Sequence, residues 1–334
     1  MKHGVIGLKA IIVEQFGSTE NMKYVDVEIP SIGPKQVLIR VMTTSVNFAD
    51  IKARYGNKGQ GKLPFIPGLE ASGIVEQVGD EVTSFLPGQR VMAFPHNGSY
   101  AEYIVADENL TFAIPDTISF DVAGSCGIVS FLSYKLLADI ANLHYGDKVL
   151  IHSASGGVGT TAIQVAKALG ADTVIGTVGN ESKIPVALEA GADHVICYTN
   201  ENFSQAVNEI TEGKGVNIIM DSIGGEITEE SMGCLANYGR LVVFGNSSGK
   251  YGQLQTSDLH SSCRSVLGFS FSTTRKEQPE ILKATSVHVM RMLESEQLKM
   301  KISEKLPLKD AALAHQFIES RKSTGKILLS MENS

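Results

Sequence analysis

The sequence has little positive charge and no long apolar run. Its 334 residues include 29 lysines and arginines against 36 acidic residues, which gives a net charge of −7. General nucleic-acid-binding proteins carry a basic surface, so this balance argues against a nucleic-acid partner. No uninterrupted apolar run approaches the roughly 20 residues needed to cross a bilayer. The N-terminus also lacks the apolar segment and cleavage site of a signal peptide. We therefore expect a cytoplasmic protein without a membrane partner.

Cysteine is also scarce. The four cysteines are widely separated and form no CxxC pair, so they indicate neither a disulfide framework nor a zinc knuckle. We interpret all four as small buried hydrophobic residues. The eight histidines show no i, i+4 pair or other spacing typical of metal ligands. The cysteines are Cys126, Cys197, Cys234 and Cys263.

Two kinds of pattern divide the chain, whose length suits two domains. Up to about residue 125, short alternating strands between Pro, Gly and Asp turns predict a β-rich module. From Lys148 onward, apolar β-branched runs alternate with helical stretches, which is typical of an α/β fold with a parallel doubly wound sheet. The tail 270–334 has no sheet of its own to complete. We expect one domain over 1–125, to which 270–334 return, and a second over 126–269.

The second domain has a regular series of expected elements. The run 239–245 is expected at the sheet edge, where an exposed strand invites pairing with a second copy. A further strand near 264–269 would complete the sheet, and the tail ends in a strand at 326–330. The other expected strands are 148–153, 173–177, 194–198 and 216–221, with helices near 158–169, 181–190, 203–212 and 226–236.

A glycine-rich turn follows the first of these strands. Gly156 and Gly157 allow a tight turn and close approach of the backbone to a pyrophosphate, and Gly159 allows the next helix to pack closely on the strand. The helix N-terminus offers unpaired N–H groups and a positive dipole end to the phosphates. The glycine-rich turn follows the first strand of a repeated βα pattern, and this position favours a dinucleotide site over an ordinary turn.

The end of the next strand favours NADP over NAD. An acidic residue there would bind the ribose 2′-hydroxyl of NAD, but residues 175–180 contain no carboxylate. Lys183 follows and can offer a positive charge to a 2′-phosphate. Glu181 is an unfavourable neighbour for that phosphate and keeps NAD open as the alternative.

Several ordered motifs carry a family resemblance. The stretch 146–167 resembles the signature of the quinone oxidoreductase/zeta-crystallin branch of the zinc-independent medium-chain dehydrogenase/reductase superfamily. The likeness extends over 45–50, 68–73, 221–224 and 244–249 and reaches the tail at Ala314-His315 and Glu319-Ser320-Arg321. It implies a GroES-like catalytic domain and a Rossmann domain with NADPH in the cleft between them.

The resemblance also implies roles for individual residues. Gly156, Gly157 and Val158 match the pyrophosphate turn. Lys183, Tyr198 and Arg321 match positions that hold the 2′-phosphate. Ser133 stands where the family usually has threonine. Ser222 and the run Phe244, Gly245, Asn246 and Ser247 match loops that line the nicotinamide half of the cofactor.

Zinc is not expected. Zinc alcohol dehydrogenases of the same superfamily have a cysteine early in the chain and a histidine in a Gly-His-Glu turn. At the equivalent stretches this chain has Asn47 and Gly68-Leu69-Glu70. Leucine cannot bind zinc, and the thiolate ligand is missing. Without a metal to polarise an alcohol, a conjugated acceptor is the easier substrate, because charge delocalises onto its oxygen while the protein positions it.

Three polar residues are the candidates near the reacting carbon. Asn47 can hold the nicotinamide ribose or carboxamide, and Tyr55 can donate a proton to the substrate oxygen. Asp50 is a catalytic candidate, although a helix-capping role explains it equally well. Water can also supply the proton, with no side chain acting as a dedicated acid.

The leading hypothesis is an NADPH:quinone reductase. The nearest alternative is an enone, alkenal or 2-haloacrylate reductase on the same scaffold, which differs in the substrate loops 55–65, 94–100 and 250–275. An alternative of another class is an NADPH-binding, RNA-binding or structural crystallin-like protein with little turnover, although the acidic composition gives RNA binding little support. The resemblance implies a homodimer through the strand at 239–245.

Overall fold

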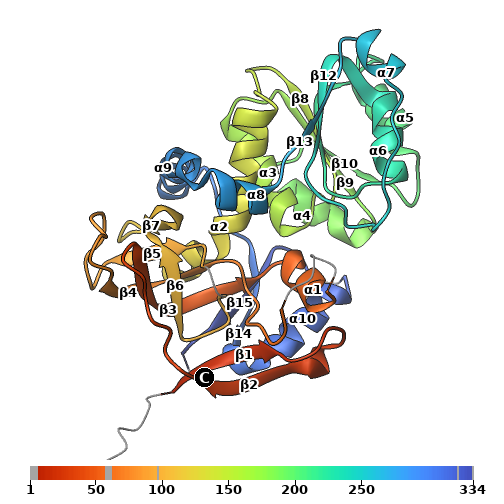
Figure 1. Ribbon diagram of the computed structural model, residues 1–334. Coiled ribbons are helices and arrows are strands. Elements are labelled where there is room, and N and C mark those ends of the chain that lie inside the picture. The colour runs from red at the N-terminus through yellow and green to blue at the C-terminus, as the bar shows by residue number, and fades with distance from the viewer. Residues whose placement is uncertain (1–6, 57–61, 96–97, 322, 333–334) are drawn as a thin grey trace, which may run out of the picture. The chain divides into compact units, whose positions relative to one another are not determined.

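The computed structural model describes residues 7–56, 62–95, 98–321 and 323–332 (Figure 1). The chain forms two compact units. One takes in the chain up to Ile128 together with Pro279–Glu294 and Met300–Ser334, and the other consists of Val129–Gln278 and Ser295–Lys299. The first unit ends three residues later than the predicted boundary at 125, and the return to it begins at Pro279 rather than at 270. The short segment Ser295–Lys299 also belongs to the second unit. The functional meaning of the two predicted domains stays a prediction.

The first unit is rich in antiparallel strands. Its helices are α1 (Phe48–Arg54), the start of α2 (Phe120–Tyr134), α9 (Leu282–Glu294) and α10 (Ala311–Glu319). Its strands are β1 (Leu8–Val13), β2 (Met22–Val27), β3 (Gln36–Val46), β4 (Ala71–Val78), β5 (Arg90–Ala93), β6 (Tyr103–Asp107), β7 (Thr111–Ala113), β14 (Ile302–Pro307) and β15 (Lys326–Ser330).

The long strand β3 organises this unit. It pairs antiparallel with β4, β6 and β15, and the larger sheet runs in the order β14-β15-β3-β4-β5-β7. The C-terminal strand therefore lies beside β3, with Ile327 opposite Val46. Buried aliphatic side chains of β3, β4 and β5 pack together as a core, including Val37, Ile39, Val75 and Val91. This pairing brings residues near 46 and 326 together.

The second unit is a parallel sheet with helices between its strands. Its helices are α3 (Gly157–Ala168), α4 (Ile184–Glu189), α5 (Phe203–Ile210), α6 (Glu226–Ser231), α7 (Ser257–His260) and α8 (Phe271–Glu277). Its strands are β8 (Lys148–Ile151), β9 (Thr173–Val178), β10 (His194–Cys197), β11 (Val216–Asp221), β12 (Leu235–Val243) and β13 (Ser265–Gly268).

The strand order β10-β9-β8-β11-β12-β13 is that of a Rossmann fold, because the chain first builds outward on one side of β8 and then on the other. All neighbours are parallel. Ligands of such sheets bind at the carboxyl ends of the strands where the order reverses, here between β8 and β11. The predicted fold class, a Rossmann sheet with a β-rich second module, is confirmed.

Two details predicted for this sheet were wrong. The strand at residues 239–245 is not the edge, because β13 pairs beyond it with Arg240 opposite Ser265. The helix predicted at 226–236 ends at Ser231. The chain then makes a 3-10 turn, and β12 begins at Leu235 opposite Val216, before a register shift. Tertiary pairing at Leu235 overrides the local helical pattern.

The cysteine prediction holds for three of the four residues. Cys126, Cys197 and Cys234 are buried, whereas Cys263 is exposed. Burial raises the pKa of the Cys234 thiol to about 12, which keeps that group a protonated core residue. Cys263 has a φ of 52° and lies just before the edge strand β13. The strand itself was expected near 264–269, but the exposure of the cysteine before it was not.

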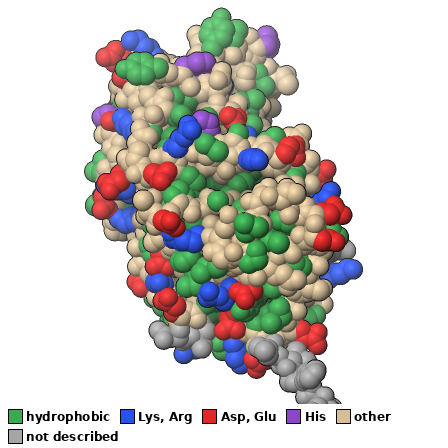
Figure 2. Space-filling view, turned by 90° about the vertical axis from the view of Figure 1, so that its left-hand side faces the viewer, with side chains coloured by type: hydrophobic (Ala, Val, Ile, Leu, Met, Phe, Trp, Pro, Cys, Tyr) green, Lys and Arg blue, Asp and Glu red, His purple; other side chains and the backbone are tan. Residues whose placement is uncertain are grey.

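One helical stretch, Phe120–Ile140, is long and apolar enough to span a membrane by length and composition. It consists of α2 and a π-helical turn over Lys135–Ile140. Because 72% of its apolar window is buried inside the protein, we interpret it as a core helix. On the face that Figure 2 draws, acidic and basic side chains are interspersed among hydrophobic ones.

Candidate functional site

The turn between β8 and α3 presents a helix N-terminus. Ser153 adopts a left-handed conformation with a φ of 55°, and Gly156 precedes the helix without a side-chain cap. The N–H groups of a first helical turn have no partner within the helix, and the helix dipole adds positive potential there. The turn therefore fits a phosphate group.

Two glycines of this turn have different surroundings. A Cβ atom at Gly159 would lie 2.3 Å from the carbonyl oxygen of Ser153, so only glycine allows α3 to approach the turn this closely. A Cβ atom at Gly156 would meet nothing nearer than the same oxygen, at 3.4 Å. The space beside Gly156 is therefore open, as close approach of a pyrophosphate requires.

A buried histidine fixes the start of this turn. His152 Nδ1 lies 2.9 Å from Thr177 Oγ1, and its Nε2 lies 2.9 Å from Ser231 Oγ. Burial lowers the pKa of His152 to about 4, against the opposing influence of Asp221. A neutral imidazole thus connects the carboxyl end of β8 with β9 and α6. The sequence contained no signal for this role, because a lone histidine has no informative spacing.

Of the three residues predicted for the adenosine end, Lys183 and Tyr198 lie after β9 and β10. Tyr198 lies against the backbone after β9, since a Cβ atom at Gly179 would be 2.5 Å from its hydroxyl oxygen. Lys183 ends a 3-10 turn and is half-buried. The carboxylate of Glu181 accepts a hydrogen bond from Asn200 Nδ2 at 2.6 Å. Arg321 belongs to the other unit and is exposed after α10.

The loops predicted for the nicotinamide end are tied to each other. Asp221, at the end of β11, is buried and accepts hydrogen bonds from the N–H groups of Ile223 (2.7 Å) and Gly224 (3.1 Å) and from the Thr228 hydroxyl. Ser247 N–H donates to the Ser222 carbonyl at 2.9 Å. Asn246 and Ser248 continue this second loop. A cavity of about 650 Å³ opens at the ends of β12 and β13, with Phe244, Gly245, Phe269 and Ser270 in its wall.

Ser133, near the end of α2, is fully buried. Its hydroxyl donates to the carbonyl oxygen of Val158 at 3.4 Å, a long contact that joins α2 to the first turn of α3. The structure therefore brings Ser133 to the glycine-rich turn, with its hydroxyl facing the protein backbone.

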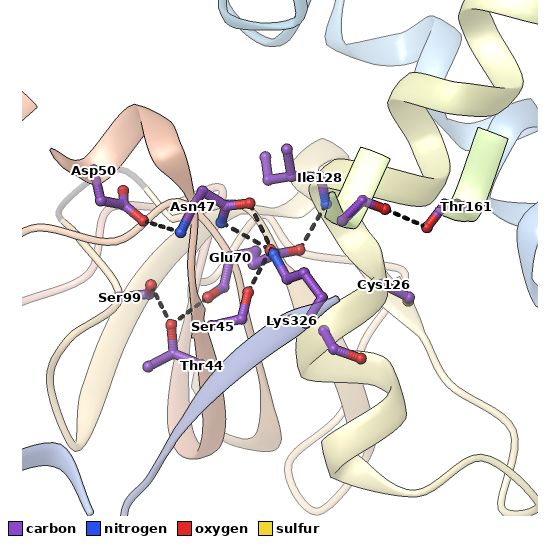
Figure 3. Close-up of polar contacts among 12 residues, drawn as sticks. Thr44, Ser45, Asn47, Asp50, Glu70, Ser99, Cys126, Ile128, Thr161 and Lys326 are labelled. Carbon is purple, nitrogen blue, oxygen red and sulfur yellow. Dashed lines mark hydrogen bonds and ion pairs between the residues drawn. The ribbon is translucent and has the colours of Figure 1, made fainter. Parts of the chain in front are cut away.

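In the first unit, a buried polar cluster surrounds Asn47 (Figure 3). Asn47 Nδ2 donates to Glu70 Oε1 at 2.9 Å, and Lys326 Nζ donates both to Asn47 Oδ1 at 2.8 Å and to Glu70 Oε1 at 2.9 Å. Ser45 Oγ adds a fourth contact, at 2.6 Å to Glu70 Oε1. Glu70 Oε2 accepts from the backbone N–H of Ile128 at 2.6 Å. Lys326 and Glu70 form a fully buried ion pair.

Asp50 is engaged by the protein at the start of α1. Its Oδ2 accepts from the Asn47 N–H at 2.8 Å and lies 3.4 Å from the Tyr100 hydroxyl. That hydroxyl is 3.1 Å from Nε2 of His315. Burial, with the negative charge of Asp50, raises the pKa of Tyr100, and burial lowers the pKa of His315 to about 3. This geometry matches the capping alternative, while a catalytic role of Asp50 stays a prediction.

Tyr55 follows α1 and is half-exposed, but its hydroxyl is occupied. It donates to Glu319 Oε1 at 2.8 Å, and the same carboxylate pairs with buried Arg54. The Arg54 guanidinium carbon lies 4.5 Å from the centre of the Tyr55 ring. Of the three predicted catalytic residues, the structure thus brings Asn47 and Asp50 together and turns the Tyr55 hydroxyl toward Glu319.

Two members of the polar cluster around Asn47 had no predicted role. In the sequence, Glu70 is part of a family motif and Lys326 is the first residue of a strand, and neither pattern indicates a functional side chain. Over the described parts of the chain, no three or more His, Cys, Asp or Glu side chains are grouped to hold a metal ion. Independence from zinc stays a prediction. Of the expected substrate loops, residues 57–61 and 96–97 lie outside the described residues.

Known families match both parts of the chain. Residues 33–116 match the alcohol dehydrogenase GroES-like domain, and residues 157–286 match the zinc-binding dehydrogenase family. A GroES-like module with a Rossmann sheet defines the medium-chain dehydrogenase/reductase class.

Relatives are similar over nearly the whole chain. A quinone oxidoreductase of Pseudomonas aeruginosa is 35% identical over 96% of this chain and 99% of its own length. A 2-haloacrylate reductase of Burkholderia is 32% identical, with 96% and 98% covered. The structure of Escherichia coli quinone oxidoreductase complexed with NADPH superposes with a TM-score of 0.89 at 32% identity, over 96% of this chain and 99% of that one. The chain therefore belongs to the quinone oxidoreductase family, which confirms the resemblance seen in its motifs.

The two glycines of the turn provide a matched pair of variants. Gly159→Ala should destabilise the second unit by about 1–3 kcal/mol, because its methyl group collides with the Ser153 carbonyl. Gly156→Ala should fold normally, since its backbone conformation and surroundings accept a methyl group. It should nevertheless weaken dinucleotide binding about tenfold or more, which corresponds to about 1.4 kcal/mol. Urea unfolding and calorimetric titration measure the two effects; normal binding by Gly156→Ala would contradict this assignment.

The buried histidines predict a loss of stability in mild acid. His152 and His315 have folded-state pKa values of about 4 and about 3, below their unfolded value of about 6.5. Between pH 6.5 and 4 the unfolded chain therefore binds protons that the folded chain does not. At pH 5 each histidine should cost about 2 kcal/mol of unfolding free energy relative to pH 7 and above.

Urea unfolding at pH 7 and pH 5 measures this loss. His152→Gln should reduce the pH-dependent drop in stability of the second unit, whereas replacing the exposed His260 by Gln should leave the drop unchanged. An equal drop in His152→Gln and the wild type would contradict the assignment.

Proposed function

We propose that this chain is an NADPH-dependent quinone reductase that reduces a quinone or another conjugated carbonyl without zinc. The single observation that carries the proposal is the uncapped helix N-terminus beside the open face of Gly156, at the switch point of a Rossmann sheet. The quinone oxidoreductase relatives, one of them complexed with NADPH, support the choice of cofactor and acceptor. When bound, NADPH supplies the hydride.

We assign the residues of the second unit to the cofactor. The N–H groups at Gly157 and Val158 bind the pyrophosphate, and the loops at Ser222 and at Phe244, Gly245, Asn246 and Ser247 line the nicotinamide, with Ser133 behind the turn. Lys183, Tyr198 and Arg321 hold the 2′-phosphate. The hydrogen bond from Asn200 to Glu181 holds that carboxylate in place but leaves its negative charge, so the choice of NADP rests on Lys183 and on the relative complexed with NADPH. Residues 126–269 form the cofactor domain in this proposal, and 1–125 with 270–334 the catalytic domain.

We assign the first unit's residues to the nicotinamide and the acceptor. The amide of Asn47 binds the nicotinamide ribose or carboxamide. Asp50 caps α1 and thereby places Asn47. The exposed faces of Phe48 and Tyr55 offer aromatic surface to a planar acceptor, which favours a quinone. Because the Tyr55 hydroxyl directs its hydrogen bond to Glu319, we assign the proton of the reduced acceptor to water.

The alternative acceptors are enones, alkenals and 2-haloacrylates. The similarity to the Burkholderia 2-haloacrylate reductase is the reason to test them. NADPH and NADH consumption should be measured with a panel of quinones, enals and haloacrylates. We expect NADPH oxidation fastest with quinones and at least about tenfold slower oxidation of NADH, a difference of about 1.4 kcal/mol. A preference for NADH would contradict the assignment of Lys183. Saturable NADPH binding without turnover would favour a structural or RNA-binding protein.

Two substitutions at Tyr55 separate the role of its ring from that of its hydroxyl. Tyr55→Phe removes only the contact with Glu319 and should keep kcat within about twofold. Tyr55→Ala removes aromatic surface and should raise the KM for a quinone by about 2- to 10-fold, as loss of about 0.5–1.5 kcal/mol of aromatic contact would. Steady-state kinetics of both variants measure this. A large loss of kcat in Tyr55→Phe would instead identify the hydroxyl as the acid.

We further propose a cytoplasmic homodimer. The edge strand β13 leaves backbone groups available to a second copy, as the edge of an open sheet does. Light scattering should give twice the chain mass of 35.8 kDa. A single-chain mass at micromolar concentration would exclude the dimer and leave the proposed chemistry untouched.

A further inference from the structure

The contacts of Asn47 fix which way its amide faces. Its Oδ1 accepts from Lys326 Nζ at 2.8 Å, and its Nδ2 donates to Glu70 Oε1 at 2.9 Å. The reversed amide would direct its N–H toward the ammonium and its oxygen toward the carboxylate, which are both repulsive contacts. The ion pair therefore selects one of two orientations that are otherwise similar in shape. The capping box also directs the backbone N–H of Asp50 toward the Asn47 side-chain oxygen. One N–H of Nδ2 remains for a ligand.

Glu70 is itself held in place. Ser45 Oγ donates to Oε1 at 2.6 Å, and the Ile128 N–H donates to Oε2 at 2.6 Å. The backbone of Asn47 is held separately, through its N–H to Asp50. Neither the carboxylate nor the amide can rotate without breaking several buried hydrogen bonds, and each such loss is costly.

A buried ion pair is a poor means of stabilising a fold, because apolar side chains of similar volume often do as well or better. Lys326 and Glu70 are both almost fully buried, at 3% and 1% exposed side-chain area. Stability alone therefore does not explain why both positions carry a charge. Both side chains contact Asn47, so we look for the explanation there.

We propose that Lys326 and Glu70 are positioning residues that hold the Asn47 amide in the single orientation needed for hydride transfer. This inference rests on the proposed function, in which Asn47 binds the nicotinamide end of NADPH. The pair acts through Asn47, so removing it slows hydride transfer while the rest of the cofactor site still binds NADPH.

The test is a double-mutant cycle. Lys326→Met alone would leave a buried carboxylate unpaired, so Lys326→Met is combined with Glu70→Gln to remove both charges. We expect kcat with a quinone to fall at least about tenfold, with less than about a threefold change in the NADPH Kd. The primary isotope effect from NADPH deuterated at the transferred position should rise. In an Asn47→Ala background the same two substitutions should change kcat by less than about twofold, because they act through that residue.

Lys305→Met serves as the matched control. Lys305 pairs with Asp121 at 2.9 Å in the same unit, without contact to Asn47, and its loss should leave kcat and the isotope effect unchanged. Circular dichroism and thermal unfolding verify that each variant is folded. If the charge-neutral pair does not fold, Lys326→Arg keeps the positive charge but presents a larger, planar group to Asn47. It should give the same fall in kcat and rise in isotope effect.

Three results would overturn the inference: full kcat in the charge-neutral variant, full kcat in Asn47→Ala, or effects of the two sites that simply multiply. Failure of the proposed function looks different. In that case the wild-type chain itself consumes no NADPH with any acceptor.

Discussion

The buried carboxylate of Glu70 is the constraint around which the first unit's site is built. A charge removed from water must be matched by donors within hydrogen-bond distance. Here the donors come from Ser45, Asn47, Ile128 and Lys326, which lie on β3, at the cap of α1, on α2 and on β15. Satisfying one carboxylate thus joins segments as far apart as Asn47 and Lys326, which are separated by 279 residues in the sequence. It also fixes the amide that we assign to the cofactor.

The second unit meets a different requirement, the close approach of backbone to a phosphate. Gly159 allows α3 to touch the turn after β8, and neutral His152 ties that turn to β9 and α6 without adding a charge. Asp221 performs a similar task for the loop after β11. Many polar side chains among the described residues of both units are bonded to the protein itself. The donors that we assign to ligands are the helix N–H groups, the side chains proposed for the 2′-phosphate, and one N–H of Asn47.

The family motifs predict a neighbourhood for the site but do not give the state of each side chain. Asp50 and Tyr55 were expected as catalytic groups, yet one accepts hydrogen bonds at the start of α1 and the other donates to Glu319. Glu181, which argued against NADP in the sequence, is bonded to Asn200. The capping role of Asp50 is local and was an alternative in the sequence, because its partner Asn47 lies three residues away. The partners of Glu181 and Tyr55 lie 19 and 264 residues away, so no local pattern could reveal them.

The amino-acid sequence alone determined the fold class, the strands β8, β9, β10 and β11, and the glycine-rich turn, because hydrophobic periodicity and glycine spacing act over a few residues. Tertiary structure decided that β13 rather than residues 239–245 forms the sheet edge, that the helix after β11 stops at Ser231, and that Cys263 is exposed. It also decided the pairing of Lys326 with Glu70 and Asn47. Such pairings depend on which distant strands become neighbours, as β15 and β3 do.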